Sequence, residues 1–195
     1  MSTTIYFKYG AMSSGKSLEL IKISHNYQER GISPLILKPE IDTRKPGYIY
    51  SKSGLHLPAI EITCDDVNKI AEVFKQKHAD HSVILVEESN FLSPEIVDFI
   101  VNYAYDHDIS SVFFFGLMTD FRSNLFPGTK RILELADKIE ESTSICWCGK
   151  KARKNARLIN GEITKEGPTI LVDDANSVVE YTTLCNYHYH IGQLK

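Results

Sequence analysis

One short segment near the N-terminus limits the possible folds of this chain more than any other. The segment GAMSSGKS, residues 10–17, fits the pattern G-x-x-x-x-G-K-[ST] at every fixed position. In such a loop, backbone N–H groups surround phosphate oxygens, the lysine adds positive charge at the β and γ phosphates, and the hydroxyl can ligate Mg²⁺. An ordinary glycine turn is the alternative, but a chain of this size matches the pattern by chance with a frequency of only about 1%.

The residues around this loop support its interpretation as a phosphate-binding loop. Residues 5–9 (IYFKY) have the composition of a short buried strand, and residues 17–30 read as a helix that stops at Gly31 and Pro34. The positive N-terminal end of that helix would face the same anion. The residues expected to contact the nucleotide here are Gly10, Ala11, Met12, Ser13, Ser14, Gly15, Lys16 and Ser17.

Strands and helices alternate along most of the chain. We expect further strands at residues 35–38, 82–88 and 112–117, and further helices starting near Asp66, at Ser93 and at Arg131, the last ending at Asp137. Residues 39–58 follow no firm period and are predicted to form a long loop. This alternation predicts an α/β fold with a mostly parallel sheet.

The chain divides into two predicted domains. Residues 1–142 are expected to form a P-loop NTPase (RecA-like) domain with helices on both faces of the sheet. After Ile145 the composition changes to cysteines, basic residues and glycines, so a small zinc-binding domain is expected at residues 143–195.

Two carboxylates end the predicted strand SVILVEE. In P-loop NTPases, an acidic residue at the end of a neighbouring strand helps to hold Mg²⁺, and a second carboxylate can accept a proton from an attacking hydroxyl. Because side chains alternate along a strand, Glu87 and Glu88 should point in different directions, one toward the metal and one toward the acceptor. A solvated pair at a strand end is the alternative.

The cysteines near the C-terminus suggest a metal site. Cys146-Trp147-Cys148 and the later pair Cys185 and His188 supply the sulfur and nitrogen ligands that tetrahedral Zn²⁺ prefers. With four filled positions, the zinc would be structural. His190 is an alternative fourth ligand, and buried free cysteines are the alternative to any metal.

Charge and hydropathy exclude some classes of protein. The formal net charge of −3 argues against a nucleic-acid polymer as the main partner, because such proteins usually carry a basic face. The first residues, MSTTIYFKYG, lack the charged and apolar regions of a signal peptide, and no apolar window is long enough to span a membrane. We therefore expect a cytoplasmic protein.

The motifs together resemble the type II thymidine kinase family. Beyond the loop, LKPEIDTR is similar to the family's K-P-x-x-D-T-R, and VEESNFL to its I-D-E-x-Q-F segment. GLMTDFRSNLFPGTKRILELADKI resembles G-L-x-T-D-F-x-x-x-x-F-x-G-S with its leucine-rich helix, and the C-x-C and Y-x-x-x-C-x-x-H elements match as well. The resemblance covers nearly the whole chain.

This resemblance implies transfer of the γ-phosphoryl group of ATP, with Mg²⁺, to the 5′-hydroxyl of thymidine. It implies Glu88 as the general base, with Lys16 and Arg44 as further catalytic residues. The nucleotide and metal side would add Asp42, Glu87 and Asn90, and the thymidine pocket would consist of Met12, Phe91, Leu117, Phe121, Phe126 and Tyr181. It also implies a zinc lobe that anchors a nucleoside-gripping loop, and a homotetramer or homodimer.

Three features depart from the family pattern. Glu87 replaces the usual Asp, Asn90 replaces the usual Gln, and the gripping segment ILVDDANSVVEY is longer and lacks glycine. The preference between thymidine and deoxyuridine therefore stays open. Two other functions remain as alternatives: a degenerate kinase-like protein that binds nucleotide without turnover, and a zinc-ribbon P-loop ATPase.

Overall fold

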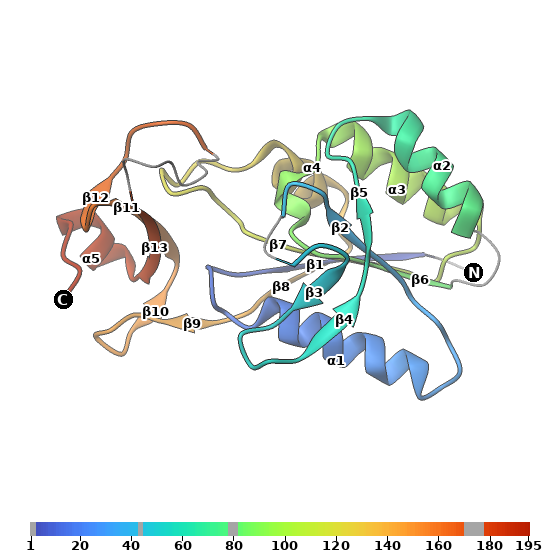
Figure 1. Ribbon diagram of the computed structural model, residues 1–195, viewed down its shortest axis with the longest axis horizontal. Coiled ribbons are helices and arrows are strands. Elements are labelled where there is room, and N and C mark those ends of the chain that lie inside the picture. Colours follow the sequence, from blue (N-terminus) through green and yellow to red (C-terminus); the bar gives the residue numbers. More distant parts are fainter. Residues whose placement is uncertain (1–2, 43–44, 78–81, 170–177) are drawn as a thin grey trace.

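A six-stranded sheet in which every neighbouring pair is parallel forms the centre of residues 4–141 (Figure 1). The structure is a computed structural model that describes residues 3–42, 45–77, 82–169 and 178–195. The strand order is β5-β2-β6-β7-β1-β8. The strands are β1 (Thr4–Tyr9), β2 (Leu35–Pro39), β5 (Ile60–Ile62), β6 (Val83–Val86), β7 (Ser111–Gly116) and β8 (Lys138–Glu141).

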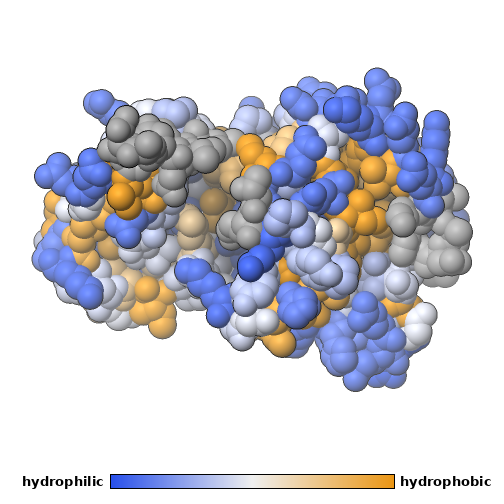
Figure 2. All heavy atoms as spheres, in the orientation of Figure 1, coloured by the Kyte–Doolittle hydropathy of each residue, from blue (hydrophilic) through white to orange (hydrophobic). Residues whose placement is uncertain are grey.

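Two apolar clusters hold helices against the two faces of this sheet. Ile84 and Val86 belong to the cluster that includes residues of α2 (Val67–Lys77), α3 (Pro94–Asp106) and α4 (Pro127–Leu135). Val83 and Leu85 belong to the other cluster, with residues of α1 (Lys16–Gln28) and Ile49. This alternation is the period of two that a strand buried on both faces requires. The outer sides of α1 and α2 are hydrophilic (Figure 2), and the predicted α/β fold is confirmed.

Two local predictions are wrong. Residues 39–58 contain a hairpin, β3 (Tyr48–Tyr50) and β4 (His56–Pro58), which lies on the α1 side of the sheet. Each strand has only three residues and mostly exposed side chains, so no period marks it in the sequence. The helix predicted at 131–137 begins at Pro127 instead, because proline suits the first turn of a helix. Asp137 lies beyond its end and accepts a hydrogen bond from the Ile5 amide at 2.8 Å.

The remaining strands are antiparallel and lie to one side of the central sheet (Figure 1). They are β9 (Ser144–Ile145), β10 (Lys151–Ala152), β11 (Lys154–Ile159), β12 (Glu162–Thr164) and β13 (Val179–Leu184), and they precede α5 (Asn186–Ile191). A third apolar cluster, which includes Ala156, Leu184 and Tyr189, forms their core. None of the helices in the described ranges is long and apolar enough to cross a lipid bilayer.

Candidate active site

The phosphate-binding loop connects the end of β1 to the start of α1, as the sequence predicts. Gly15 and Ser13 both have positive φ, 88° and 60°, so the backbone turns sharply before the helix. Gly10 is in close contact with its surroundings, because a Cβ there would lie 2.4 Å from the carbonyl oxygen of Ser142. The loop therefore presents backbone N–H groups at the N-terminus of a 13-residue helix, an arrangement suited to phosphate.

Lys16 and Ser17 follow the turn at the first two positions of α1. The Lys16 ammonium donates to the carbonyl oxygen of Ala11 at 2.9 Å, so it lies against its own loop. The Ser17 hydroxyl donates to the carboxylate of Glu87, which is 3% exposed at the end of β6. A hydroxyl and a carboxylate that meet beside a phosphate-binding loop are hard oxygen donors, so these two residues fit Mg²⁺.

Glu88 has a different environment from its neighbour Glu87. Its backbone is left-handed, with φ of 46°, because β6 has ended and a short 3₁₀ turn (Ser89–Phe91) begins. Non-glycine residues in this conformation are often found at functional sites. Glu88 lines the main cavity, whereas Glu87 is buried against Ser17. The two carboxylates therefore point in different directions, Glu87 toward Ser17 and Glu88 toward the cavity.

Of the two residues of LKPEIDTR that are predicted to belong to the site, the structure describes Asp42 but not Arg44. Asp42 is buried at the cavity, where its carboxylate pairs with the ammonium of Lys38 at 3.3 Å. Lys38 is fully buried and also donates to the carbonyl oxygen of Lys45 at 3.0 Å. Arg44 lies outside the described residues, as do residues 170–177 of the segment ILVDDANSVVEY.

Asn90 does not line the cavity. Its side chain is 1% exposed, and its Oδ1 atom accepts a hydrogen bond from the Leu117 amide at 2.9 Å. Its Nδ2 atom has no hydrogen-bond partner among the described residues. Asn90 therefore fixes the chain after β7 in this structure, and its expected contact with the nucleotide stays a prediction.

The phosphate-binding loop and a group of apolar side chains line the same cavity, which has a volume of about 680 Å³. All six residues that the resemblance assigns to the nucleoside line it, namely Met12, Phe91, Leu117, Phe121, Phe126 and Tyr181. Phe91 and Phe126 meet edge to face, with ring centroids 5.7 Å apart. None of these six belongs to the three apolar clusters, although Phe121 and Phe126 are themselves buried, so their side chains form the wall of this cavity.

Several residues of this cavity carry no signal in the sequence. Asn155, on β11, accepts a hydrogen bond from the Met12 amide at 2.8 Å and donates to the carbonyl oxygen of Thr119 at 3.3 Å. Thr169 and Val179, on either side of residues 170–177, also line the cavity. The C-terminal strands thus contribute to the same site as the phosphate-binding loop. No local pattern signals these residues, because their role depends on contacts distant in sequence.

The four predicted metal ligands come together. Cys146 and Cys148 lie in the turn between β9 and β10, and Cys185 and His188 lie at the start of α5. Their ligand atoms are all within 4.8 Å of one another, with His188 Nδ1 3.4 Å from Cys146 Sγ. Three thiols and one imidazole form a donor set that fits tetrahedral Zn²⁺. His190 is exposed and does not belong to this group, so the alternative fourth ligand is not supported.

The electrostatics of this cluster favour an ionised thiol. Burial by itself raises the pKa of Cys146, but backbone N–H groups of Cys148 and Cys185 and the ring of His188 lower that pKa to about 6. A neighbouring thiol has the opposite shift: a backbone N–H group of Lys150 lowers the pKa of Cys148, but burial and the sulfurs of Cys146 and Cys185 together raise it. A bound cation would stabilise both thiols in the ionised form, because a thiolate is the form that ligates metal.

Comparison with known proteins identifies relatives along almost the whole chain. A family model described as thymidine kinase matches residues 3–189. A thymidine kinase of Lactiplantibacillus plantarum is 39% identical over 187 residues, which cover 95% of this chain and 94% of the relative. Thymidine kinases of Lactococcus lactis subsp. lactis and Streptomyces avermitilis are each 36% identical, covering 95% and 97% of this chain and 96% and 89% of the relatives.

The similarity to solved structures is weaker. A crystal structure of Bacteroides Pif1 bound to ssDNA covers 72% of this chain and 38% of that chain, with 14% identity and a TM-score of 0.37. That score is too low to define a shared fold.

Proposed function

The chain belongs to the thymidine kinase family, and we propose on this basis that it transfers the γ-phosphoryl group of ATP to the 5′-hydroxyl of thymidine or deoxyuridine. One observation carries the proposal: the phosphate-binding loop, the Glu88 carboxylate and an apolar aromatic wall line a single cavity. Phosphoryl transfer needs a bound triphosphate, a proton acceptor and a positioned hydroxyl, and this cavity offers a group for each.

The phosphate side would be formed by the loop and its neighbours. Backbone N–H groups of residues 10–17 and the Lys16 ammonium would hold the phosphates of ATP. Ser17 and Glu87 would hold Mg²⁺, which neutralises phosphate charge when bound. Asp42 lies at the cavity and would support this side, and Arg44 would contribute a positive charge.

Glu88 would act as the general base. As the 5′-oxygen attacks the γ-phosphorus, the carboxylate would take the hydroxyl proton while the bond from phosphorus to the bridging oxygen of ADP breaks. The aromatic wall would hold the flat base and so direct the sugar toward Glu88. Flat apolar groups suit such a base, and a few polar groups at its edge would set specificity.

The zinc cluster would have a structural role, with Cys146, Cys148, Cys185 and His188 as ligands. These positions fill a tetrahedral site, so no open position remains for chemistry. The zinc would fix the strands that carry Asn155 and Tyr181. We further propose that the chain assembles as a homotetramer or homodimer, as the family resemblance implies.

The proposal is tested by a panel of nucleosides incubated with ATP and Mg²⁺, with the products identified by mass. We expect thymidine or deoxyuridine monophosphate as the main product. Glu88→Gln should lower kcat about 100-fold or more, because a positioned general base contributes at least that much. ATP binding without turnover of any nucleoside would contradict the proposal, and a near-normal kcat of Glu88→Gln would exclude this residue as the base.

A further inference from the structure

Arg157 has an unusual environment for a charged side chain. It lies on β11, has no exposed surface, and is the largest fully buried side chain among the described residues. A buried cation is strongly destabilising unless its donors are satisfied. Moving the hydrogen-bond acceptors of Arg157 away from it would therefore cost much free energy.

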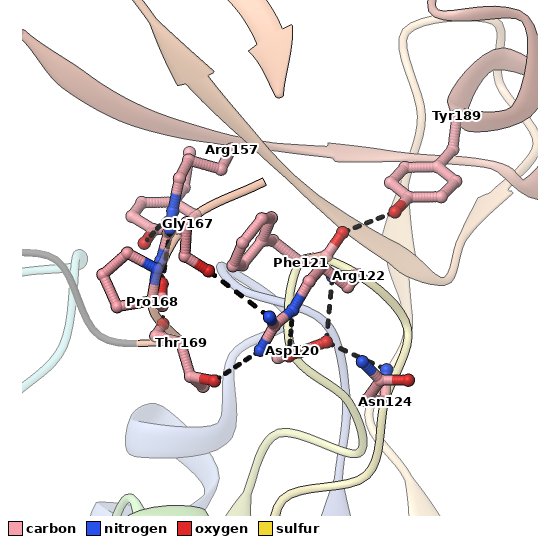
Figure 3. A network of polar contacts seen from close by, with 10 residues as sticks. Asp120, Phe121, Arg122, Asn124, Arg157, Gly167, Pro168, Thr169 and Tyr189 are labelled. Atoms are coloured by element: carbon pink, nitrogen blue, oxygen red, sulfur yellow. Dashed lines mark hydrogen bonds and ion pairs between the residues drawn. The ribbon is translucent and has the colours of Figure 1, made fainter. Parts of the chain in front are cut away.

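The Arg157 guanidinium contacts three separate segments of the chain. Its two terminal nitrogens donate to the carbonyl oxygens of Pro168 at 2.6 Å and Thr169 at 2.8 Å (Figure 3). Its Nε atom donates to the Tyr181 hydroxyl at 2.8 Å. Its plane lies over the ring of Phe121, with the central carbon 3.7 Å from the ring centroid. Among the described residues, the hydrogen bonds of this cation all end on neutral oxygens.

These contacts place Arg157 directly behind one wall of the cavity. Phe121, Thr169 and Tyr181 line the cavity, whereas Arg157 itself does not. Arg157 and Tyr181 are register partners on β11 and β13, so the pairing of these strands fixes their distance. One buried side chain thus sets the relative positions of three wall residues.

A second set of contacts fixes the same wall. Arg122 pairs with Asp120 at 3.1 Å and reaches the Thr169 hydroxyl at 2.7 Å (Figure 3). The Tyr189 hydroxyl donates to the carbonyl oxygen of Phe121 at 2.5 Å. The wall therefore depends on a network that joins the chain after β7 to the C-terminal strands.

We propose that Arg157 is a positioning residue for the nucleoside end of the cavity, which it serves through Phe121, Thr169 and Tyr181. The proposal rests on the proposed kinase function. Only a planar fork can bridge two adjacent carbonyl groups and stack on an aromatic ring at the same time, so lysine cannot replace arginine here. The Arg157 contacts described above do not include the phosphate-binding loop, so its loss should affect the nucleoside and not ATP.

The test compares Arg157→Lys and Arg157→Gln with a matched control, Arg153→Gln. The Arg153 side chain is 57% exposed, and its ion pair with Glu141 is long, at 3.9 Å. Arg153 therefore has no role comparable to that of Arg157. In both Arg157 variants we expect the KM for thymidine to rise about tenfold or more, while the KM for ATP changes less than about twofold. The control should keep both values.

Thermal midpoints and zinc content will show whether each variant is folded. If Arg157→Gln fails to fold, Arg157→Lys carries the test, because it keeps the charge. An equal rise of both KM values in a folded variant, or an unchanged KM for thymidine, would overturn the proposal while leaving the kinase function intact.

A second measurement separates this proposal from the proposed function. If the unmodified protein phosphorylates no nucleoside, the kinase function fails, and hydrogen exchange of peptides covering residues 165–169 then decides the role of Arg157. Faster exchange in Arg157→Lys than in the unmodified protein supports the positioning role of Arg157. Equal exchange overturns it.

Discussion

Lys38 and Asp42 form a charged pair that is almost fully excluded from solvent. Their side chains are 0% and 7% exposed, and the pair lies between the end of β2 and the cavity. In a buried pair of this kind, the loss of one partner leaves the other charge poorly compensated. Lys38 therefore connects the stability of the fold to the position of a carboxylate at the candidate active site.

Lys38→Met should lower the free energy of unfolding by about 3 kcal/mol, because it removes one member of a buried ion pair. Urea unfolding followed by circular dichroism measures this. Lys52→Met is the matched control: Lys52 is exposed at the same cavity, and its loss should change stability by less than about 0.5 kcal/mol.

The double variant Lys38→Met, Asp42→Asn gives a further check. It should be more stable than Lys38→Met alone, because the buried carboxylate that has lost its ion pair with Lys38 is replaced by a neutral amide. A double variant that loses as much stability as the two single variants combined would show that the two groups are not coupled.

At the scale of secondary structure, α4 shows how a helix is fitted to its neighbour. Gly128, in its first turn, lies so close to the chain before α3 that a Cβ would be 2.3 Å from the carbonyl oxygen of Leu92. Glycine is needed here for close approach and not for an unusual backbone angle. This contact fixes α4 next to the 3₁₀ turn that follows Glu88.

Gly128→Ala should therefore lower the free energy of unfolding by about 2 kcal/mol, since the added methyl group must displace backbone atoms. Lys130→Ala, an exposed position in the same helix, should change it by less than about 0.5 kcal/mol. Equal urea midpoints for the two variants would show that the backbone yields easily.

The elements that the sequence predicts best are those with strong local patterns. Continuous apolar runs identify β6 and β7, and Ser93 with Pro94 marks the start of α3, where the Ser93 hydroxyl accepts from the Ile96 amide. The β3–β4 hairpin has no such pattern, because its strands are short and mostly exposed. Arg157 and Asn155 escape prediction because their partners lie far away in the sequence.

At the scale of the whole molecule, the cavity lies where the parallel sheet meets the antiparallel strands. Phe121 comes from the first part and Tyr181 from the second, and both line the same wall. The division into residues 1–142 and 143–195 stays a prediction, although the strands change from parallel to antiparallel near that boundary. A site built from both parts needs both parts folded.

Removal of zinc should therefore affect the nucleoside site. We expect about one equivalent of zinc per chain, and loss of C-terminal structure on chelation. His188→Gln should lose the metal, whereas His190→Gln should keep it, because only His188 lies with the cysteines. Metal analysis of the two purified variants distinguishes the ligands, and equal zinc content in both would show that His188 is not required.

Asn155 joins the phosphate-binding loop to the segment that follows β7. Its amide oxygen accepts from Met12 and its amide nitrogen donates to Thr119, so movement of either segment changes the hydrogen bonding of the other. Binding of the two substrates should then be thermodynamically linked, each raising the affinity for the other by the same factor. Titration calorimetry of thymidine, with and without a non-hydrolysable ATP analogue, measures that factor. Asn155→Ala should bring it close to one, and an unchanged factor would show that the linkage takes another route.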